Sequence, residues 1–284
     1  MVVNQIPSAM NHLSKILIAA APVLFFSCKD DDVEVPAPTV VKEWNLALSA
    51  KNEVPAASND AATGTAKLTL MSDNTLKYEF AVAQLEIDDV LTMSHLHAGD
   101  AGTAGPVILP LAMSFTAPNA SGTVALRQSL VDSLKSDENE IYLNVHSQAS
   151  PAGIARAQLN TTVELAMDIA LSSDNEVTDP PTPIEPEVTG TAIIRVTANK
   201  KLYSKVTASG LGEGDELTMS HIHTGADGSN GPVYITLCEN KDDFDTLKVI
   251  DLSDEELAKL KSDALYVNVH SKNFPAGVAR GQIR

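Results

Sequence analysis

A six-residue phrase that occurs twice places the strongest constraint on how this chain can fold. Residues 92–97 read T-M-S-H-L-H and residues 218–223 read T-M-S-H-I-H, and both are followed by a glycine-rich stretch that ends in Gly-Pro. Residues 142–146 and 266–270, Y-L-N-V-H and Y-V-N-V-H, form a second matching pair. A repeat at this scale indicates one structural unit built twice. Since 284 residues leave room for about two domains, we expect two tandem copies of one domain.

The spacing of apolar residues predicts strands in both copies. Residues 44–49, 76–82 and 163–171 place apolar side chains at every second position, which is the periodicity of a strand with one buried face. Helical spacing is confined to residues 127–135 and 253–260, and the second of these opens with the capping-box pattern S-D-E-E. We therefore predict an all-β fold of two tandem antiparallel β-sandwich domains, immunoglobulin-like or superoxide-dismutase-like, each with one short helix.

These patterns divide the chain into four segments. Residues 1–27 are expected to be a signal peptide, and residues 28–41 a tether, because their acidic, proline-bearing composition provides too little apolar surface to fold. The two domains are expected at residues 42–162 and 163–284. Because only a short linker separates the last strand of one copy from the first strand of the next, the domains should abut.

The first 28 residues have the features of an export signal. Lys15 precedes an apolar run at residues 16–26, which is shorter than the roughly 20 residues needed to span a bilayer, and Cys28 follows. This stretch resembles a bacterial lipoprotein signal, which implies that Cys28 is lipidated and becomes the first mature residue. Lys29 and the aspartates at 30–32 resemble the acidic surface-export tag of lipoproteins in the Bacteroidetes group.

The expected location is therefore the outer membrane of the cell envelope. The protein would be exported and held to the membrane by its lipid anchor, with the cell surface as one possible destination. Two alternatives remain open from the sequence. The alternatives to a lipoprotein signal are an ordinary signal peptide cut at a small residue and a start codon placed too early.

Composition narrows the classes of partner and reaction. The net charge of −17 disfavours nucleic acid, since phosphate backbones are bound through Lys and Arg. The two cysteines, Cys28 and Cys238, form no disulfide framework, and Cys238 is expected to be a small buried hydrophobe. The sequence has neither a G-x-S-x-G elbow nor the Lys-Ser/Thr of a phosphate loop. We therefore assign no catalytic residue and favour a protein that is not an enzyme.

Six of the seven histidines fall at matching places in the two copies. Residues two apart on a strand point to the same face, with Cα atoms roughly 6.5 Å apart, so the two histidines of each H-x-H motif can converge with the later histidine. Three neutral imidazoles suit zinc or copper. The alternative is a structural network, or a binding site of unknown type, in which the histidines bond backbone groups and hold the glycine-rich loop. The candidate ligands are His95, His97 and His146, and then His221, His223 and His270.

The repeated motifs together resemble the CHRD (chordin-type) domain, present twice. In each copy the resemblance rests on an Asn-Glu-Val motif, the H-x-H with its glycine-rich loop, and an Asn-Val-His motif that leads to a Pro, a Gly, an Arg and a Gln. The resemblance implies a compact extracytoplasmic β domain and no particular reaction. Among the motif residues, Glu53, Arg156, Glu176 and Arg280 are structural or binding candidates, and an Arg–Glu ion pair in each copy is favoured over an anion site.

These observations lead to one expected function and one alternative. We expect a lipid-anchored cell-envelope or surface protein whose two domains form a non-enzymatic binding or structural module for an unidentified protein or matrix ligand. The alternative is a metalloprotein that binds zinc or copper through the histidine triad of each domain.

Overall fold

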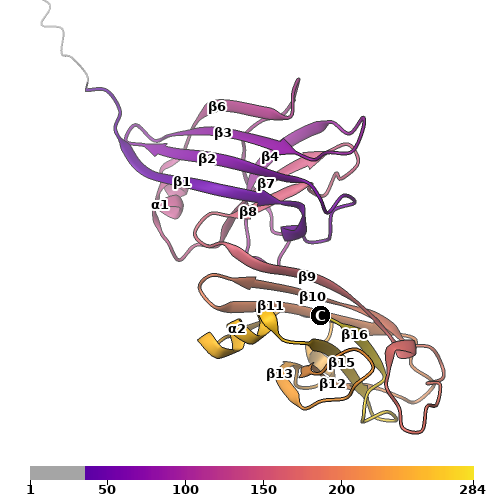
Figure 1. Ribbon diagram of the computed structural model, residues 1–284. Helices are drawn as coiled ribbons and strands as arrows, with labels where there is room; N and C mark the ends of the chain where they lie inside the picture. Colours follow the sequence, from indigo (N-terminus) through magenta and orange to yellow (C-terminus); the bar gives the residue numbers. More distant parts are fainter. Residues whose placement is uncertain (1–35) are drawn as a thin grey trace, which may run out of the picture. The chain divides into compact units, whose positions relative to one another are not determined.

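The computed structural model describes residues 36–284. The predicted signal peptide, Cys28 and the first part of the predicted tether lie outside the described residues. Within residues 36–284, no helix has both the length and the apolar character needed to cross a membrane. The described residues form two successive β modules, each with a short helix (Figure 1).

The first module is one antiparallel sheet of eight strands. Its strands pair in the order β5-β4-β7-β8-β1-β2-β3-β6. The helix α1 (Gln128–Lys135) and the 3-10 turn η1 (Ala50–Asn52) complete it. The strands are β1 (Val40–Ser49), β2 (Thr63–Met71), β3 (Thr75–Ala83), β4 (Leu91–Ala98), β5 (Val107–Pro110), β6 (Asn119–Ala125), β7 (Ile141–Ser147) and β8 (Ala155–Gln158).

The second module repeats the first strand for strand. Its order, β13-β12-β15-β16-β9-β10-β11-β14, is that of the first module shifted by eight. It also contains α2 (Asp254–Ser262) and the 3-10 turns η2 (Ser173–Asn175) and η3 (Lys241–Asp243). The strands are β9 (Val163–Ser172), β10 (Thr189–Thr197), β11 (Lys201–Ser209), β12 (Leu217–Thr224), β13 (Val233–Cys238), β14 (Lys248–Asp251), β15 (Leu265–Ser271) and β16 (Ala279–Gln282). The predicted tandem all-β fold is confirmed.

Each sheet curls on itself to enclose its own core. In the first module β1 and β8 are paired at a single position, Ser49 with Arg156. The half-sheets β5-β4-β7-β8 and β1-β2-β3-β6 can therefore face each other as the layers of a sandwich. Leu68 and Phe80 from one half and Leu96 and Leu143 from the other belong to one buried cluster. This arrangement agrees with the predicted β-sandwich.

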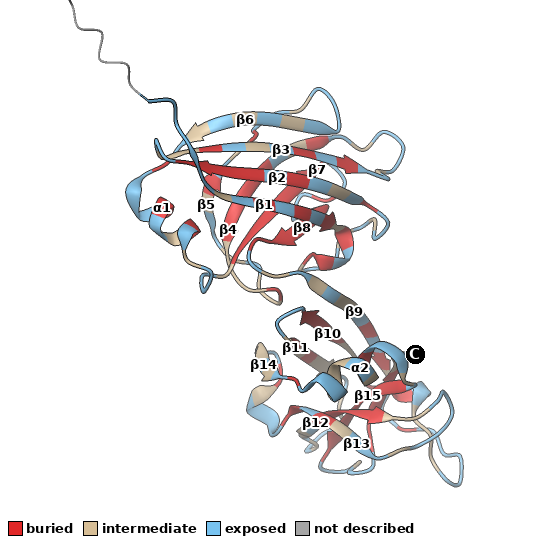
Figure 2. Cartoon of the chain, turned by 60° about the vertical axis from the view of Figure 1, so that its left-hand side comes forward, coloured by how far each residue is buried: buried red, intermediate tan, exposed pale blue. Residues whose placement is uncertain are grey.

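The central strand β7 is buried on both of its faces, and this is what positions the site. Leu143 and Val145 point into the core. Tyr142, Asn144 and His146 alternate with them on the other face, yet they are also buried. Strand β15 has the same pattern in the second module, and both strands are coloured as buried in Figure 2. A layer of buried polar side chains therefore lies outside each apolar core.

The helices and the second cysteine agree with the sequence analysis. The capping box at Ser253 is formed, because the Ser253 hydroxyl accepts from the Glu256 backbone N–H while the Glu256 carboxylate accepts from the Ser253 N–H. Such a cap satisfies helix-end donors that have no partner within the helix. Cys238 is 1% exposed and belongs to the core of the second module, and burial raises the pKa of its thiol to about 12.

Candidate metal centre

Three histidines converge on the outer face of the first module. His95 and His97 lie on β4, and His146 lies near the end of the neighbouring strand β7. One donor nitrogen from each ring lies within 4.8 Å of the other two. The ring centroids of the three pairs are 5.0–6.0 Å apart. The alternation of β4 thus brings together the three side chains that the sequence predicted would meet.

Backbone carbonyls determine which nitrogen of two rings carries the proton. His97 Nδ1 lies 2.9 Å from the Gly105 carbonyl oxygen, and His146 Nδ1 lies 3.0 Å from the Pro151 carbonyl oxygen. A carbonyl oxygen only accepts hydrogen bonds, so each Nδ1 is the protonated nitrogen of its neutral ring. The Nε2 atom of each ring therefore has a free lone pair. This is the arrangement in which a metal-binding histidine is held by a second partner.

Two of the free lone pairs have unusual surroundings. His97 Nε2 is buried and has no hydrogen-bond partner. His146 Nε2 lies 3.1 Å from His95 Nδ1. Donor atoms on a tetrahedral ion with bonds of about 2.0–2.1 Å are about 3.3 Å apart. The separation fits either an N–H···N hydrogen bond between the two rings or two lone pairs that share one ion.

The second module reproduces every one of these contacts. His221 Nδ1 lies 3.2 Å from His270 Nε2. His223 Nδ1 lies 2.9 Å from the Gly231 carbonyl, and His270 Nδ1 lies 3.1 Å from the Pro275 carbonyl. His223 Nε2 is again buried without a partner. Because the same unpaired atom recurs in an independent copy, it is a feature of the domain.

Burial keeps the imidazoles neutral at physiological pH. The six histidines are only 7–9% exposed, and burial lowers the pKa of each ring. For His146 and His270 the pKa falls to about 4. Neutral rings keep the lone pair that a metal needs. No carboxylate belongs to either group of potential ligands in the described chain.

A stacked tyrosine and arginine support the H-x-H strand. The Tyr142 ring stacks on His97 with centroids 4.8 Å apart and planes 13° apart, and the Arg156 guanidinium lies 3.5 Å from the Tyr142 centroid. The Tyr142 hydroxyl accepts from the Gly105 backbone N–H at 2.9 Å. The stack recurs as His223, Tyr266 and Arg280, with 5.0 Å and 14° between the first two rings and 3.5 Å from Arg280 to Tyr266. Each stack fixes the ring whose Nε2 has no partner.

The predicted arginine candidates bind the glycine-rich loops. Arg156 donates to the Asp100 carbonyl and to Gln158, whose amide in turn donates to the Gly99 carbonyl. None of the ion pairs among the described residues joins Arg156 to Glu53. The expected Arg–Glu ion pair is therefore not formed. In the second module Arg280 donates to the carbonyls of Ala226 and Ser229.

The predicted glutamate candidates lie behind the loop that holds the third histidine. Glu53 is 1% exposed, and burial raises its pKa to about 8, against the opposing effect of Arg156. Gly153, with φ at +149°, packs so closely that a Cβ atom there would lie 2.4 Å from Glu53 Oε2. Glu176 has the same place beside Gly277, and burial raises its pKa to about 7. These carboxyl groups support the turn that carries the Pro151 or Pro275 carbonyl.

The roles of the tyrosines in the stacks do not follow from the sequence. Tyr142 and Tyr266 open the repeated motif Y-x-N-V-H. Their recurrence in the same motif as matching histidines is a signal, but a motif does not say which ring lies against which. That information comes from the pairing of β4 with β7, which sets Tyr142 opposite His97.

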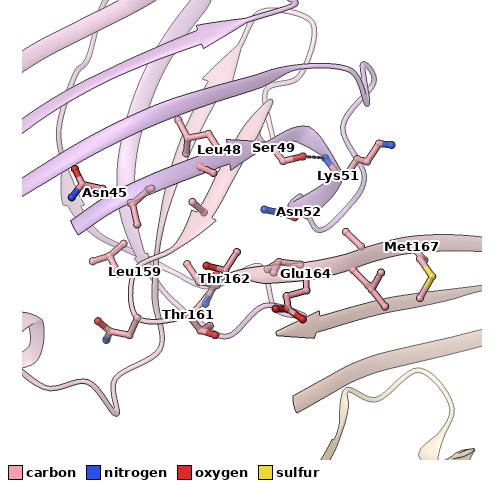
Figure 3. Close-up of a pocket in the computed structure, with 18 of the residues that line it drawn as sticks. Asn45, Leu48, Ser49, Lys51, Asn52, Leu159, Thr161, Thr162, Glu164 and Met167 are labelled. Atoms are coloured by element: carbon pink, nitrogen blue, oxygen red, sulfur yellow. Dashed lines mark hydrogen bonds between the residues drawn. The ribbon is translucent and has the colours of Figure 1, made fainter. Parts of the chain in front are cut away.

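A separate hollow elsewhere lacks the features of a metal site. It has a volume of about 600 Å³ and is lined mainly by residues of β1, η1, the end of β8, the linker that follows it, and β9. Figure 3 shows Asn45, Leu48, Thr162, Glu164 and Met167 around it. Its lining contains no histidine and none of the buried unpaired polar atoms of the described residues. The candidate chemistry therefore lies at the triads.

Comparison with known proteins gives one result. A family model described as the CHRD domain matches residues 44–159 and, a second time, residues 167–283. Neither the curated proteins nor the solved structures include a match to this chain.

Proposed function

The chain belongs to the CHRD domain family, of which it contains two copies, and from their paired histidine triads we propose that each domain binds one transition-metal ion, either zinc or copper. The observation that carries the proposal is the buried, unpartnered Nε2 atom of His97 and of His223. In each domain this histidine belongs to a triad in which one donor nitrogen of each ring lies within 4.8 Å of those of the other two.

Energetics favour a metal site over a purely structural network. Leaving a buried polar atom without a partner costs about 1–3 kcal/mol. A network would use hydrogen bonds to satisfy its members, but here the carbonyl bonds occupy the Nδ1 atoms of His97 and His146, and His97 Nε2 is left without a partner. An ion held between the three rings would satisfy that atom and bring the rings into one coordination shell.

The ligand set also limits what such an ion can do. Three protein ligands leave at least one coordination position for water or another group, as in catalytic zinc sites. The residues of this chain would hold the ion, exclude bulk water on the buried side, and fix each ring through a backbone carbonyl. The proposal therefore takes up the alternative stated from the sequence, a metalloprotein that binds zinc or copper through the histidine triad of each domain.

We also propose that these domains act in the cell envelope. The support is in the sequence: the lipoprotein-like signal, Cys28 and the acidic residues that follow it. A lipid-anchored, exported protein with two metal sites would bind metal ions outside the cytoplasm.

Metal analysis of the purified protein tests the proposal. Residues 36–284, expressed without a histidine tag, should take up two equivalents of zinc or copper per chain on titration, measured by mass spectrometry of the bound metal. His97→Ala and His223→Ala should each remove one equivalent, and the double variant should remove both. The single variants serve as controls for each other, because each leaves one triad intact. No specific uptake, with a melting temperature unchanged by added metal, would contradict the proposal.

A further inference from the structure

A methionine lies beside each triad on the same strand face. Met93 is two residues before His95 on β4, and the alternation of a strand points the two side chains to one side. Ser94 and Leu96, at the intervening positions, are fully buried. Met93 is 37% exposed, so its side chain reaches solvent, whereas the three histidines are buried.

The sheet also places this methionine beside the third histidine. Met93 is the cross-strand partner of His146 in the pairing of β4 with β7. Side chains that are directly opposite on antiparallel strands have Cβ atoms about 4.5–5.5 Å apart. A methionine side chain has three rotatable bonds and a polarizable sulfur at its far end. The thioether therefore lies within reach of the point on which the imidazoles converge.

The second module has the same arrangement. Met219 precedes His221 by two residues on β12 and is the cross-strand partner of His270. It is 40% exposed. A single exposed methionine needs no explanation, but this one stands at the same register, beside the same two ligands, in both domains.

We propose that Met93 and Met219 each supply a fourth, thioether ligand to the adjacent triad, and that both sites therefore prefer copper(I). This inference rests on the proposed metal-binding function and names the metal. Thioether sulfur is a soft ligand that selects copper(I), whereas zinc sites in proteins use thiolate, imidazole and carboxylate.

The charges around the site favour a monovalent ion. All four ligands are neutral, and no carboxylate belongs to either potential ligand group in the described chain. A guanidinium stands behind each triad, 3.5 Å from the tyrosine ring that stacks on His97 or His223. A fixed positive charge close to a neutral ligand set repels a divalent ion about twice as strongly as a monovalent one.

Substitution of the methionines by leucine tests the inference, because leucine keeps the apolar volume and removes the sulfur. Copper(I) affinity would be measured under anaerobic, reducing conditions by competition with bicinchoninate, and zinc affinity by competition with a chromophoric chelator. We expect Met93→Leu with Met219→Leu to lose about tenfold or more in copper(I) affinity, with zinc affinity unchanged. A sulfur shell in the copper X-ray absorption spectrum of the wild type should disappear in the variant.

Met71→Leu and Met167→Leu are matched controls, one in each module, and should change neither affinity. Melting temperatures of the metal-free variants check that all are folded. Wild-type copper(I) affinity in the double variant, or no sulfur shell in the wild type, would overturn the thioether ligand while leaving the histidine sites in place. If the wild type binds neither ion, the proposed function itself fails, and this inference fails with it.

Discussion

At the scale of single residues, the site depends on where protons reside. Two carbonyl bonds leave His97 Nε2 and His146 Nε2 unprotonated, and burial keeps the rings neutral by lowering their pKa. Burial raises the pKa of Glu53 and Glu176 instead, because it favours the neutral form, and the neutral form of a carboxylic acid is the protonated one. Burial therefore shifts both the histidines and the glutamates of the polar layer toward their neutral forms.

This balance predicts how stability depends on pH. Burial raises the pKa of Glu53 to about 8 and that of Glu176 to about 7, against an ordinary value of 4.5. Between pH 4.5 and these values the folded state binds more protons than the unfolded state, so the glutamates favour folding at low pH and lose that contribution as the pH rises. Burial lowers the pKa of His146 and His270 from 6.5 to about 4. Between these values the unfolded state binds more protons than the folded state, so the histidines reduce the free energy of unfolding as the pH falls.

Comparison with a glutamine variant isolates the glutamates. Glu53→Gln with Glu176→Gln keeps the shape and stays neutral, and the histidine contribution is the same in both proteins. We expect the free energy of unfolding of the variant, relative to wild type, to rise between pH 5 and pH 8. Urea unfolding of the metal-free proteins at several pH values measures the difference. A difference that does not change with pH would mean that the carboxyl groups titrate normally.

At the scale of elements, strand periodicity predicted the meeting of the histidines but not its details. Alternation along β4 and the repeated motif on β7 were enough to expect His95, His97 and His146 on one face. The protonated nitrogen of each ring depends on the Gly105 and Pro151 carbonyls, which belong to loops without periodicity.

The turn that follows β7 gives a prediction at this scale. Gly153→Ala should destabilise the fold by about 2–3 kcal/mol, since alanine would have to accept a positive φ and also meet the Glu53 carboxyl. Gly214→Ala is the matched control, because Gly214 also has positive φ, at +77°, but nothing lies within 4 Å of a Cβ atom there. It should cost only about 1–2 kcal/mol for the backbone.

Urea unfolding measures both glycine variants. Gly153→Ala should also weaken metal binding by the first domain alone, because the Pro151 carbonyl that holds His146 belongs to the same turn. Equal losses of stability in the two variants would show that Glu53 moves aside at no cost. An unchanged first site would show that this turn does not position His146.

At the scale of the whole molecule, the repeat determines what the chain can do. Each module has its own sheet, its own core and a complete triad, so residues 36–284 form two candidate sites of one kind rather than one site assembled from both halves. The sequence predicted this duplication because matching motifs recur throughout. The sequence predicted the layered architecture less directly. Alternation shows which residues face a core, but it does not show that one continuous sheet of eight strands folds around that core.

The proposed lipid anchor is testable separately from metal binding. If Cys28 is lipidated, cells fed labelled palmitate should incorporate label into the wild-type protein and not into Cys28→Ala, which should move from the membrane fraction to the soluble fraction.

Protease added to intact cells should degrade the wild type if the acidic tag directs it to the surface. Replacing Asp30, Asp31 and Asp32 by alanine should then keep the label and protect the protein, because the tag acts after lipidation. Label that persists in Cys28→Ala would contradict the anchor, whereas a labelled but protease-resistant wild type would place the two domains on the inner side of the membrane.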